Sequence, residues 1–408
     1  MSSFKRFFTL ITPNGLSEFQ HQMLVWLTCV FFNSYVLFAN NSIVPFQAQI
    51  EFDLALSKTQ FALLSSSAYA FIYTFGQLVN GFFINRYGFK SVMIFAALCC
   101  IQSNCILSYS DYYYFVLLAR CLAAIGGVFS LITFVLLTRT FFSPNYQGAL
   151  IGWGALVAGF SASFAFGVSH FWHGSWHSFY QILLIVSCCM TLAIATFIPN
   201  DLGAARPQSI SLQSMSELLK DPYIFTLIIF CASIYSGIQY FSSNEIFIFL
   251  KLKSITPDGA RTLMFASWIG YAIGCMLSGH FADRLKRPDH SLIGYSVACF
   301  ICFLSIVYFK TRFALTLLFF FGLGVAASGI IIALTVLNVL LDNQRFTYAT
   351  CMVNFSVGVV SMVNPPIVGM ILDITSKQYG LLDLKVYQFA FLYLLCFMRS
   401  KVQFFCCF

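Results

Sequence analysis

The chain has 408 residues, of which 59% are apolar and only 9% are charged. Soluble domains average about 45–50% apolar and about 25% charged residues, so this composition excludes a soluble protein and predicts that lipid surrounds most of the chain. The net charge of +8 does not indicate a nucleic-acid partner, because the basic residues lie in short segments between apolar runs and not in one patch.

Long apolar runs separated by short polar segments fill almost the whole chain. Each run is apolar all round, which predicts helices in lipid rather than amphipathic surface helices. Strands are excluded, because the open edge of a sheet cannot satisfy its hydrogen bonds in hydrocarbon. One crossing needs about 20 apolar residues, so we predict an all-α integral membrane protein with about twelve transmembrane helices. The runs are 22–46, 61–84, 91–109, 112–139, 147–170, 178–198, 222–250, 262–282, 290–309, 312–341, 345–372 and 386–405.

The longest polar connection divides these runs into two equal sets. This predicts an N-terminal bundle at residues 1–198, a cytoplasmic linker at 199–221 and a C-terminal bundle at 222–408. Lys and Arg are more frequent in the segments that would be cytoplasmic if the N-terminus is inside, which predicts that orientation. Arg399-Ser400-Lys401 interrupts the last run, so we expect a shortened last helix.

A short basic turn follows the second apolar run and recurs after the eighth. The two copies read Gly81-Phe-Phe-Ile-Asn85-Arg86-Tyr-Gly88-Phe-Lys90 and Gly279-His-Phe-Ala-Asp283-Arg284-Leu-Lys286-Arg287. Both resemble the signature loop of the major facilitator superfamily of secondary transporters, in which Asp-Arg lies between two glycines and a basic residue follows. The resemblance implies two pseudo-symmetric six-helix bundles that rock around a central site.

In this family the acidic residue of the loop faces the N-terminus of a neighbouring helix and latches the outward-open state. The resemblance therefore implies a gating role for Gly81, Asn85, Arg86, Gly88, Lys90, Gly279, Asp283 and Arg284. The first copy has Asn85 in place of the acid, and an uncharged side chain predicts a weaker latch in that half. A plainer interpretation is that any tight turn between membrane helices favours glycine and basic residues.

Arg120 lies inside the fourth run, followed by small residues and Gly126-Gly127. A charge within the membrane is costly unless it faces an interior cavity or a partner. The segment resembles the fourth-helix motif of the family, which implies that Arg120 faces the interior and handles a proton or an anion. Alternatively, Arg120 extends its side chain to the outer interface.

Further polar residues fall in the runs that line the central cavity of the family. The resemblance implies substrate or coupling roles for Asn33 and Asn40 in the first run, for Gln239, Tyr240, Asn244 and Glu245 in the seventh, and for Asn338 in the tenth. Burial of Glu245 would suit a proton-coupled site, although its closeness to Lys251 also fits the outer interface. For each Asn, an ordinary interhelical hydrogen bond is the alternative.

The resemblance implies a secondary transporter and not an enzyme. We expect proton-coupled uptake of a small organic anion or metabolite by a monomer in a bacterial inner membrane, with a cytoplasmic N-terminus and without a cofactor or metal ion. No phosphate-binding loop of the Gly-x4-Gly-Lys-Ser/Thr type occurs. The alternatives are a drug or metabolite exporter, disfavoured because the fifth run lacks the Gly-Pro pair of the family's antiporters, and an inactive or sensor-like relic, favoured by Asn85 and the interrupted last run.

Overall fold

The structure is a computed structural model that describes residues 18–200, 216–282, 288–379 and 383–405. In the N-terminal half the helices are α2 (Glu18–Asn41), η1 (Val44–Phe46), α3 (Gln47–Asp53), α4 (Lys58–Ala62), the π-helix η2 (Leu63–Ser67), α5 (Ala68–Tyr87), α6 (Phe89–Tyr109), α7 (Tyr113–Phe141), α8 (Pro144–Phe171) and α9 (Trp176–Phe197). In the C-terminal half they are α11 (Pro222–Ser243), α12 (Ile246–Leu252), α13 (Pro257–Ala282), α14 (Pro288–Tyr308), α15 (Phe313–Ala327), α16 (Gly329–Leu340), α17 (Asn343–Tyr379) and α18 (Leu384–Phe405).

The all-helical prediction is confirmed, and every predicted run corresponds to one helix or to a series of consecutive helices. Among the described residues, nine helices are long and apolar enough to cross a membrane. The segments Leu156–Gly167 and Leu384–Met398 are shorter apolar stretches. α18 continues through residues 399–401 to Phe405, so the charges in the last run do not end the helix there.

Several predicted single helices are interrupted. The first run ends as a regular helix at Asn41 and continues through η1 and α3, and the tenth divides into α15 and α16 at Ser328. The second begins as α4, widens into the π-helix η2 and then continues as α5. Such π-turns are frequent at functional sites, and hydropathy cannot reveal them because it does not depend on the hydrogen-bond register.

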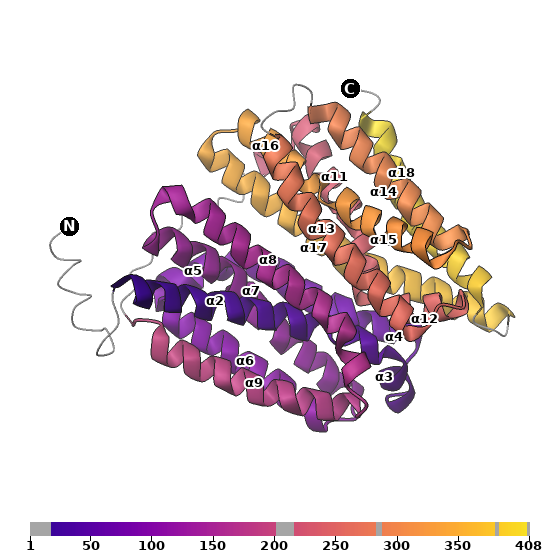
Figure 1. Ribbon diagram of the computed structural model, residues 1–408, viewed down its shortest axis with the longest axis horizontal. Coiled ribbons are helices and arrows are strands. Elements are labelled where there is room, and N and C mark those ends of the chain that lie inside the picture. Colours follow the sequence, from indigo (N-terminus) through magenta and orange to yellow (C-terminus); the bar gives the residue numbers. More distant parts are fainter. Residues whose placement is uncertain (1–17, 201–215, 283–287, 380–382, 406–408) are drawn as a thin grey trace.

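The helices of the two halves lie on opposite sides of the molecule (Figure 1). Within the N-terminal half, α6 packs on α7 and α9, and α2 packs on α7 and α8. Within the C-terminal half, α15 packs on α13 and α14, and α11 packs on α17. The halves meet where α13 packs on α8 and where α17 packs on α4 and α5. Figure 1 shows them converging near α3, α4 and α12.

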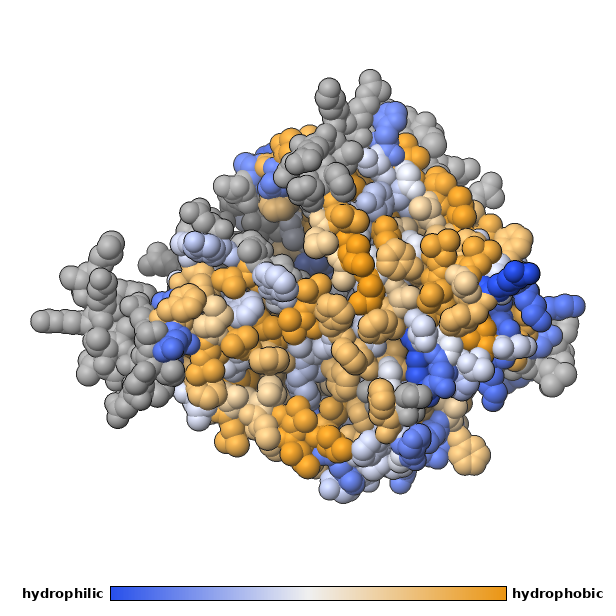
Figure 2. Space-filling view, in the orientation of Figure 1, coloured by the Kyte–Doolittle hydropathy of each residue, from blue (hydrophilic) through white to orange (hydrophobic). Residues whose placement is uncertain are grey.

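The surface of the molecule is largely apolar. Figure 2 shows hydrophobic residues across the middle of the viewed face and hydrophilic residues mainly toward its margins. Large exposed side chains such as Phe52, Phe164 and Leu192 are 85%, 60% and 65% exposed. So much exposed apolar surface is typical of a protein in lipid.

Candidate functional site

The chain turns sharply between α3 and α4, and this turn positions the first residues of the site. Ala55 adopts a left-handed backbone conformation (φ 50°). Ser57 then begins α4 with a capping box: its Oγ accepts a hydrogen bond from Gln60 N at 3.2 Å, and its own N–H donates to Gln60 Oε1 at 2.9 Å. This pair satisfies two backbone donors at the helix start and fixes the direction of Lys58.

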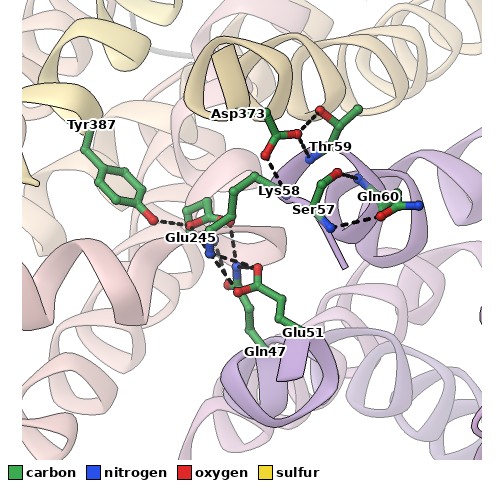
Figure 3. Close-up of polar contacts among 9 residues, drawn as sticks. All are labelled: Gln47, Glu51, Ser57, Lys58, Thr59, Gln60, Glu245, Asp373 and Tyr387. Carbon is green, nitrogen blue, oxygen red and sulfur yellow. Dashed lines mark hydrogen bonds and ion pairs between the residues drawn. The ribbon is translucent and has the colours of Figure 1, made fainter. Parts of the chain in front are cut away.

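Five side chains from both halves form what we call the inter-half network (Figure 3). Lys58 Nζ lies 2.7 Å from Glu51 Oε2 and 3.4 Å from Glu245 Oε2. Gln47 Nε2 donates to Glu51 Oε1 at 2.7 Å and to Glu245 Oε1 at 2.6 Å. Tyr387 OH donates a short hydrogen bond to Glu245 Oε2. The network therefore joins α3 and α4 of one half to the α11–α12 connection and α18 of the other.

The network is largely shielded from solvent. The side chain of Lys58 is 13% exposed, that of Glu51 14% and that of Glu245 4%. Burial alone would lower the pKa of Lys58, but the carboxylates of Glu245 and Glu51 outweigh burial and raise that pKa above its usual value. Lys58 thus stays positively charged and forms ion pairs with both Glu51 and Glu245.

Glu245 also breaks the seventh predicted run. Its φ of 57° and ψ of −8° are left-handed, and they separate α11 from α12. A side chain other than glycine costs roughly 1–2 kcal/mol in this conformation, and the surroundings offset the cost. Glu245 N donates to Gln47 Oε1 at 3.0 Å, and the adjacent Asn244 Oδ1 accepts from Ser65 Oγ at 2.8 Å. The seventh run therefore breaks at Asn244–Glu245, and both side chains contact the N-terminal half.

Asp373 of α17 binds the start of α4 from the other half (Figure 3). Its Oδ1 accepts from Lys58 N at 2.9 Å, and its Oδ2 accepts from Thr59 N at 2.9 Å and from Thr59 Oγ1 at 2.5 Å. A carboxylate is favoured at a helix N-terminus, where the free N–H groups carry partial positive charge. The contact is therefore a charge–dipole bond between the halves.

Arg120 lies inside the N-terminal half and is only 1% exposed. Its Nε donates to Leu64 O at 3.2 Å, and its Nη2 donates to Ser65 O at 2.9 Å and to Asn40 Oδ1 at 2.6 Å. The guanidinium carbon is 5.4 Å from the centre of the Tyr69 ring. These partners are neutral, so Arg120 holds two carbonyls of η2 while its own charge lacks a carboxylate partner among the described residues.

Of the other predicted polar residues, Tyr240 lies close enough to Glu245 of the network to interact with it electrostatically. Asn33 is buried, and its Oδ1 accepts from Ser130 Oγ at 3.0 Å, which joins α2 to α7. Tyr240 is buried against the Phe391 ring, with 5.6 Å between ring centroids. Gln239 is half-buried, and Asn338 is exposed near the end of α16.

The first signature turn depends on a glycine conformation. Gly88 joins α5 to α6 with a φ of 78°, and a Cβ there would meet nothing within 4 Å, so the backbone and not crowding favours glycine. Arg86 is exposed and lies 5.6 Å from the centre of the Tyr87 ring, and Lys90 is half-exposed. The surroundings of Gly81, Asn85 and Gly279, and all of Asp283 and Arg284, lie outside the described residues.

Sequence reasoning missed five residues of the site: Gln47, Glu51, Lys58, Asp373 and Tyr387. All five lie in or next to segments taken as loops or helix ends, where polar residues are ordinary. Asp373 carried a usable signal, because it is the one acidic residue of α17 and directly follows the apolar run predicted at 345–372. Within the part of the chain that the structure describes, no three His, Cys, Asp or Glu side chains are grouped to hold a metal ion.

Comparisons with known proteins agree with this fold. A family model described as Major Facilitator Superfamily matches residues 26–252. The chain is similar to the structure of a bacterial homologue of the human lysosomal transporter Spinster, in an inward-facing and unoccupied conformation. The identity is 12%, 94% of this chain and 96% of that chain are covered, and the TM-score is 0.74. It is also similar to a mutant of the nucleoside transporter NupG, with 14% identity, coverage of 96% and 99%, and a TM-score of 0.73. No curated protein matches the sequence.

Proposed function

The chain belongs to the Major Facilitator Superfamily, whose members are secondary transporters of small solutes and not enzymes, and we propose that it performs proton-coupled uptake of a small organic anion or metabolite. The protein is a multi-pass integral membrane protein. The observation that carries the proton-coupling proposal is the inter-half network, in which Glu51 and Glu245 from opposite halves share Lys58 and Gln47.

The proposed topology gives this network its place in the transport cycle. A cytoplasmic N-terminus puts the signature turns in the cytoplasm and the α3–α4–α12 end outside. The polar contacts between the halves concentrate on residues 47–67 at that outer end. The structure then corresponds to a state that is closed to the outside, and transport to the inside requires these contacts to form and break in every cycle.

Charge balance suggests how a proton takes part. The closed network holds two carboxylates and one ammonium, so it carries one excess negative charge when neither carboxylate is protonated. When the outer end is open, Glu51 and Glu245 separate and meet external water. A proton taken up there removes the repulsion between the carboxylates and favours closure. Closure would thereby depend on protonation from the outside.

Arg120 supports an anionic solute. Its partners Leu64 O, Ser65 O and Asn40 Oδ1 are neutral, so its buried positive charge has no carboxylate partner among the described residues. A solute carboxylate or phosphate near this charge would lower its cost. With Arg120 and Asn40 we retain Asn33, Gln239, Tyr240, Asn244, Glu245 and Asn338 as proposed substrate or coupling residues, and the signature-turn residues as proposed inner-gate residues.

We place this activity in the two-bundle arrangement expected from the sequence. Residues 1–198 and 222–408 would move as two bundles joined by the linker at 199–221, in a bacterial inner membrane, with a monomer as the working unit. The contacts of α17 with α4 and α5, and of α13 with α8, are the surfaces on which such rocking would occur.

Uptake into proteoliposomes tests the proposal. The full-length protein is assayed with a panel of labelled organic anions, nucleosides and neutral metabolites, with and without an inward proton gradient. We expect the gradient to drive accumulation of an anion. Glu245→Gln should reduce gradient-driven accumulation to the level without a gradient, yet preserve exchange of solute across the membrane. The matched control is Asp111→Asn, because Asp111 pairs with His177 within the N-terminal half.

Three outcomes would contradict parts of the proposal. If Glu245→Gln accumulates as much solute under the gradient as the unaltered protein does, Glu245 does not couple proton binding to transport. Accumulation only with an outward proton gradient would favour an exporter. If folded protein moves no solute under any gradient, the inactive or sensor-like alternative is correct.

A further inference from the structure

Two adjacent prolines in α17 leave two backbone carbonyls without helical donors. Pro365 and Pro366 lie inside the helix. Proline has no N–H group, so the carbonyl four residues earlier loses its partner in the α-helix. The carbonyls concerned are those of Ser361 and Met362. A buried carbonyl without a donor costs free energy, so these two need partners from elsewhere.

Two serines of the N-terminal half supply those partners. Ser66 Oγ donates to Ser361 O at 2.9 Å, and Ser67 Oγ donates to Met362 O at 2.7 Å. Both serines are buried, at 4% and 6% exposure. Consecutive donors thus meet consecutive acceptors, and each hydroxyl takes the place of one missing proline N–H.

The donors belong to the π-helix η2, and Arg120 stabilises this turn. The N–H of Ala68 bonds to Leu63 O, five residues earlier, which is the π-helical spacing. Arg120 donates to the next two carbonyls, Leu64 O and Ser65 O. The turn that presents the two serine hydroxyls is therefore held by a buried side chain of the same half.

Glycines allow the two segments to approach this closely. A Cβ at Gly358, on α17 before the acceptor carbonyls, would overlap Thr74 Oγ1 of α5. A Cβ at Gly369, beyond the prolines, would lie 2.9 Å from Lys58 O. Gly358, Ser361–Met362, Gly369 and Asp373 lie on one face of α17 at helical spacing. That face is the surface that contacts the N-terminal half.

We propose that Ser66 and Ser67, together with the carbonyls freed by Pro365 and Pro366, form a latch that stabilises closure of the outer end. When the halves part on this side, water replaces the hydroxyls, so the bonds are made in one state of the cycle and exchanged for water in the other. This latch rests on the proposed alternating access, but its test measures opening and not transport. Failure of the latch would therefore leave the proposed transport function standing.

Hydrogen–deuterium exchange of the full-length protein in lipid nanodiscs tests the latch. Exchange is followed in α3 (Gln47–Asp53) and α12 (Ile246–Leu252), which separate when the outer end opens. Removing both hydroxyls with Ser66→Ala and Ser67→Ala should increase the open fraction by about fivefold for each bond lost. The control is Ser108→Ala, a buried serine whose hydroxyl donates to Asn104 O in its own helix. It should leave exchange in both segments unchanged.

A second pair of substitutions tests whether the carbonyls freed by the prolines contribute to the latch. Pro365→Ala and Pro366→Ala restore the missing N–H groups, so the carbonyls of Ser361 and Met362 gain helical donors. In that background the double serine substitution should increase opening by much less than in the unaltered chain. An equal increase in both backgrounds would overturn the latch.

Ser66→Thr and Ser67→Thr keep the hydroxyls and provide a check that does not depend on the proline variants. Protection in α3 and α12 should stay close to that of the unaltered protein. Opening equal to that of the alanine variants would show that packing, and not the hydroxyl–carbonyl bonds, closes this end.

Discussion

The buried guanidinium of Arg120 is hydrogen-bonded by neutral oxygen atoms, and the described part of the chain places no acid beside it. The guanidinium takes acceptors from the π-helix η2 and from Asn40, which are neutral groups that Lys could not bridge with the same planar geometry. The residue therefore has two consequences: it shapes η2, and it leaves a positive charge in the interior.

Replacing Arg120 tests the first consequence. Arg120→Met leaves Leu64 O, Ser65 O and Asn40 Oδ1 without their donor and should cost about 3 kcal/mol of stability, because buried acceptors lose their partners. Thermal unfolding in detergent measures the change. The exposed Arg312→Met is the control and should leave the melting temperature unchanged. Equal melting temperatures for both variants would show that Arg120 does not brace η2.

At the scale of elements, α4 is a short helix whose start is capped twice. Ser57 caps it from its own half, and Asp373 caps it from α17. A five-residue helix has little stability of its own, so the second cap ties its order to the closed arrangement.

The two caps should have different effects. Asp373→Ala removes about 1 kcal/mol of charge–dipole stabilisation that exists only when the halves touch. Hydrogen exchange should therefore rise in α4 and in α12 together. Ser57→Ala should raise exchange in α4 alone, because Ser57 and its partner Gln60 both belong to the same half. If Asp373→Ala changed only α4, the contact would be a local cap and not a bond between the halves.

Element positions and element interruptions differ in how well the sequence predicts them. Helices such as α6 and α9 follow directly from their apolar runs, because the hydrophobic effect acts on each segment by itself. The π-helix η2 and the left-handed Glu245 depend instead on partners elsewhere: Arg120 holds the first, and Gln47 the second. The local sequence around η2 and Glu245 does not indicate these contacts with residues far away in the chain.

For the whole molecule, closure on one side should oppose closure on the other. Gly358→Ala would place a methyl group against Thr74 Oγ1 and push α17 away from α5. In a rocking transporter, exchange should then rise at α3 and α12 and fall around Gly88. Gly159→Ala is the control, since a Cβ there meets nothing within 4 Å. A rise at both ends would indicate general loosening rather than rocking.

The sequence by itself determined that lipid surrounds the chain, that the chain is helical and where the main helices lie. Through the two basic turns it also indicated the family. These properties depend on the composition of short segments and on their order. Each segment contains the information for its own helix, without partners elsewhere in the chain. Only the tertiary structure decided the site at the interface. Gln47 and Glu245 are 198 positions apart, and Ser66 and Ser361 are 295 apart. No local pattern indicates which buried polar groups will meet, because that depends on how the two halves pack.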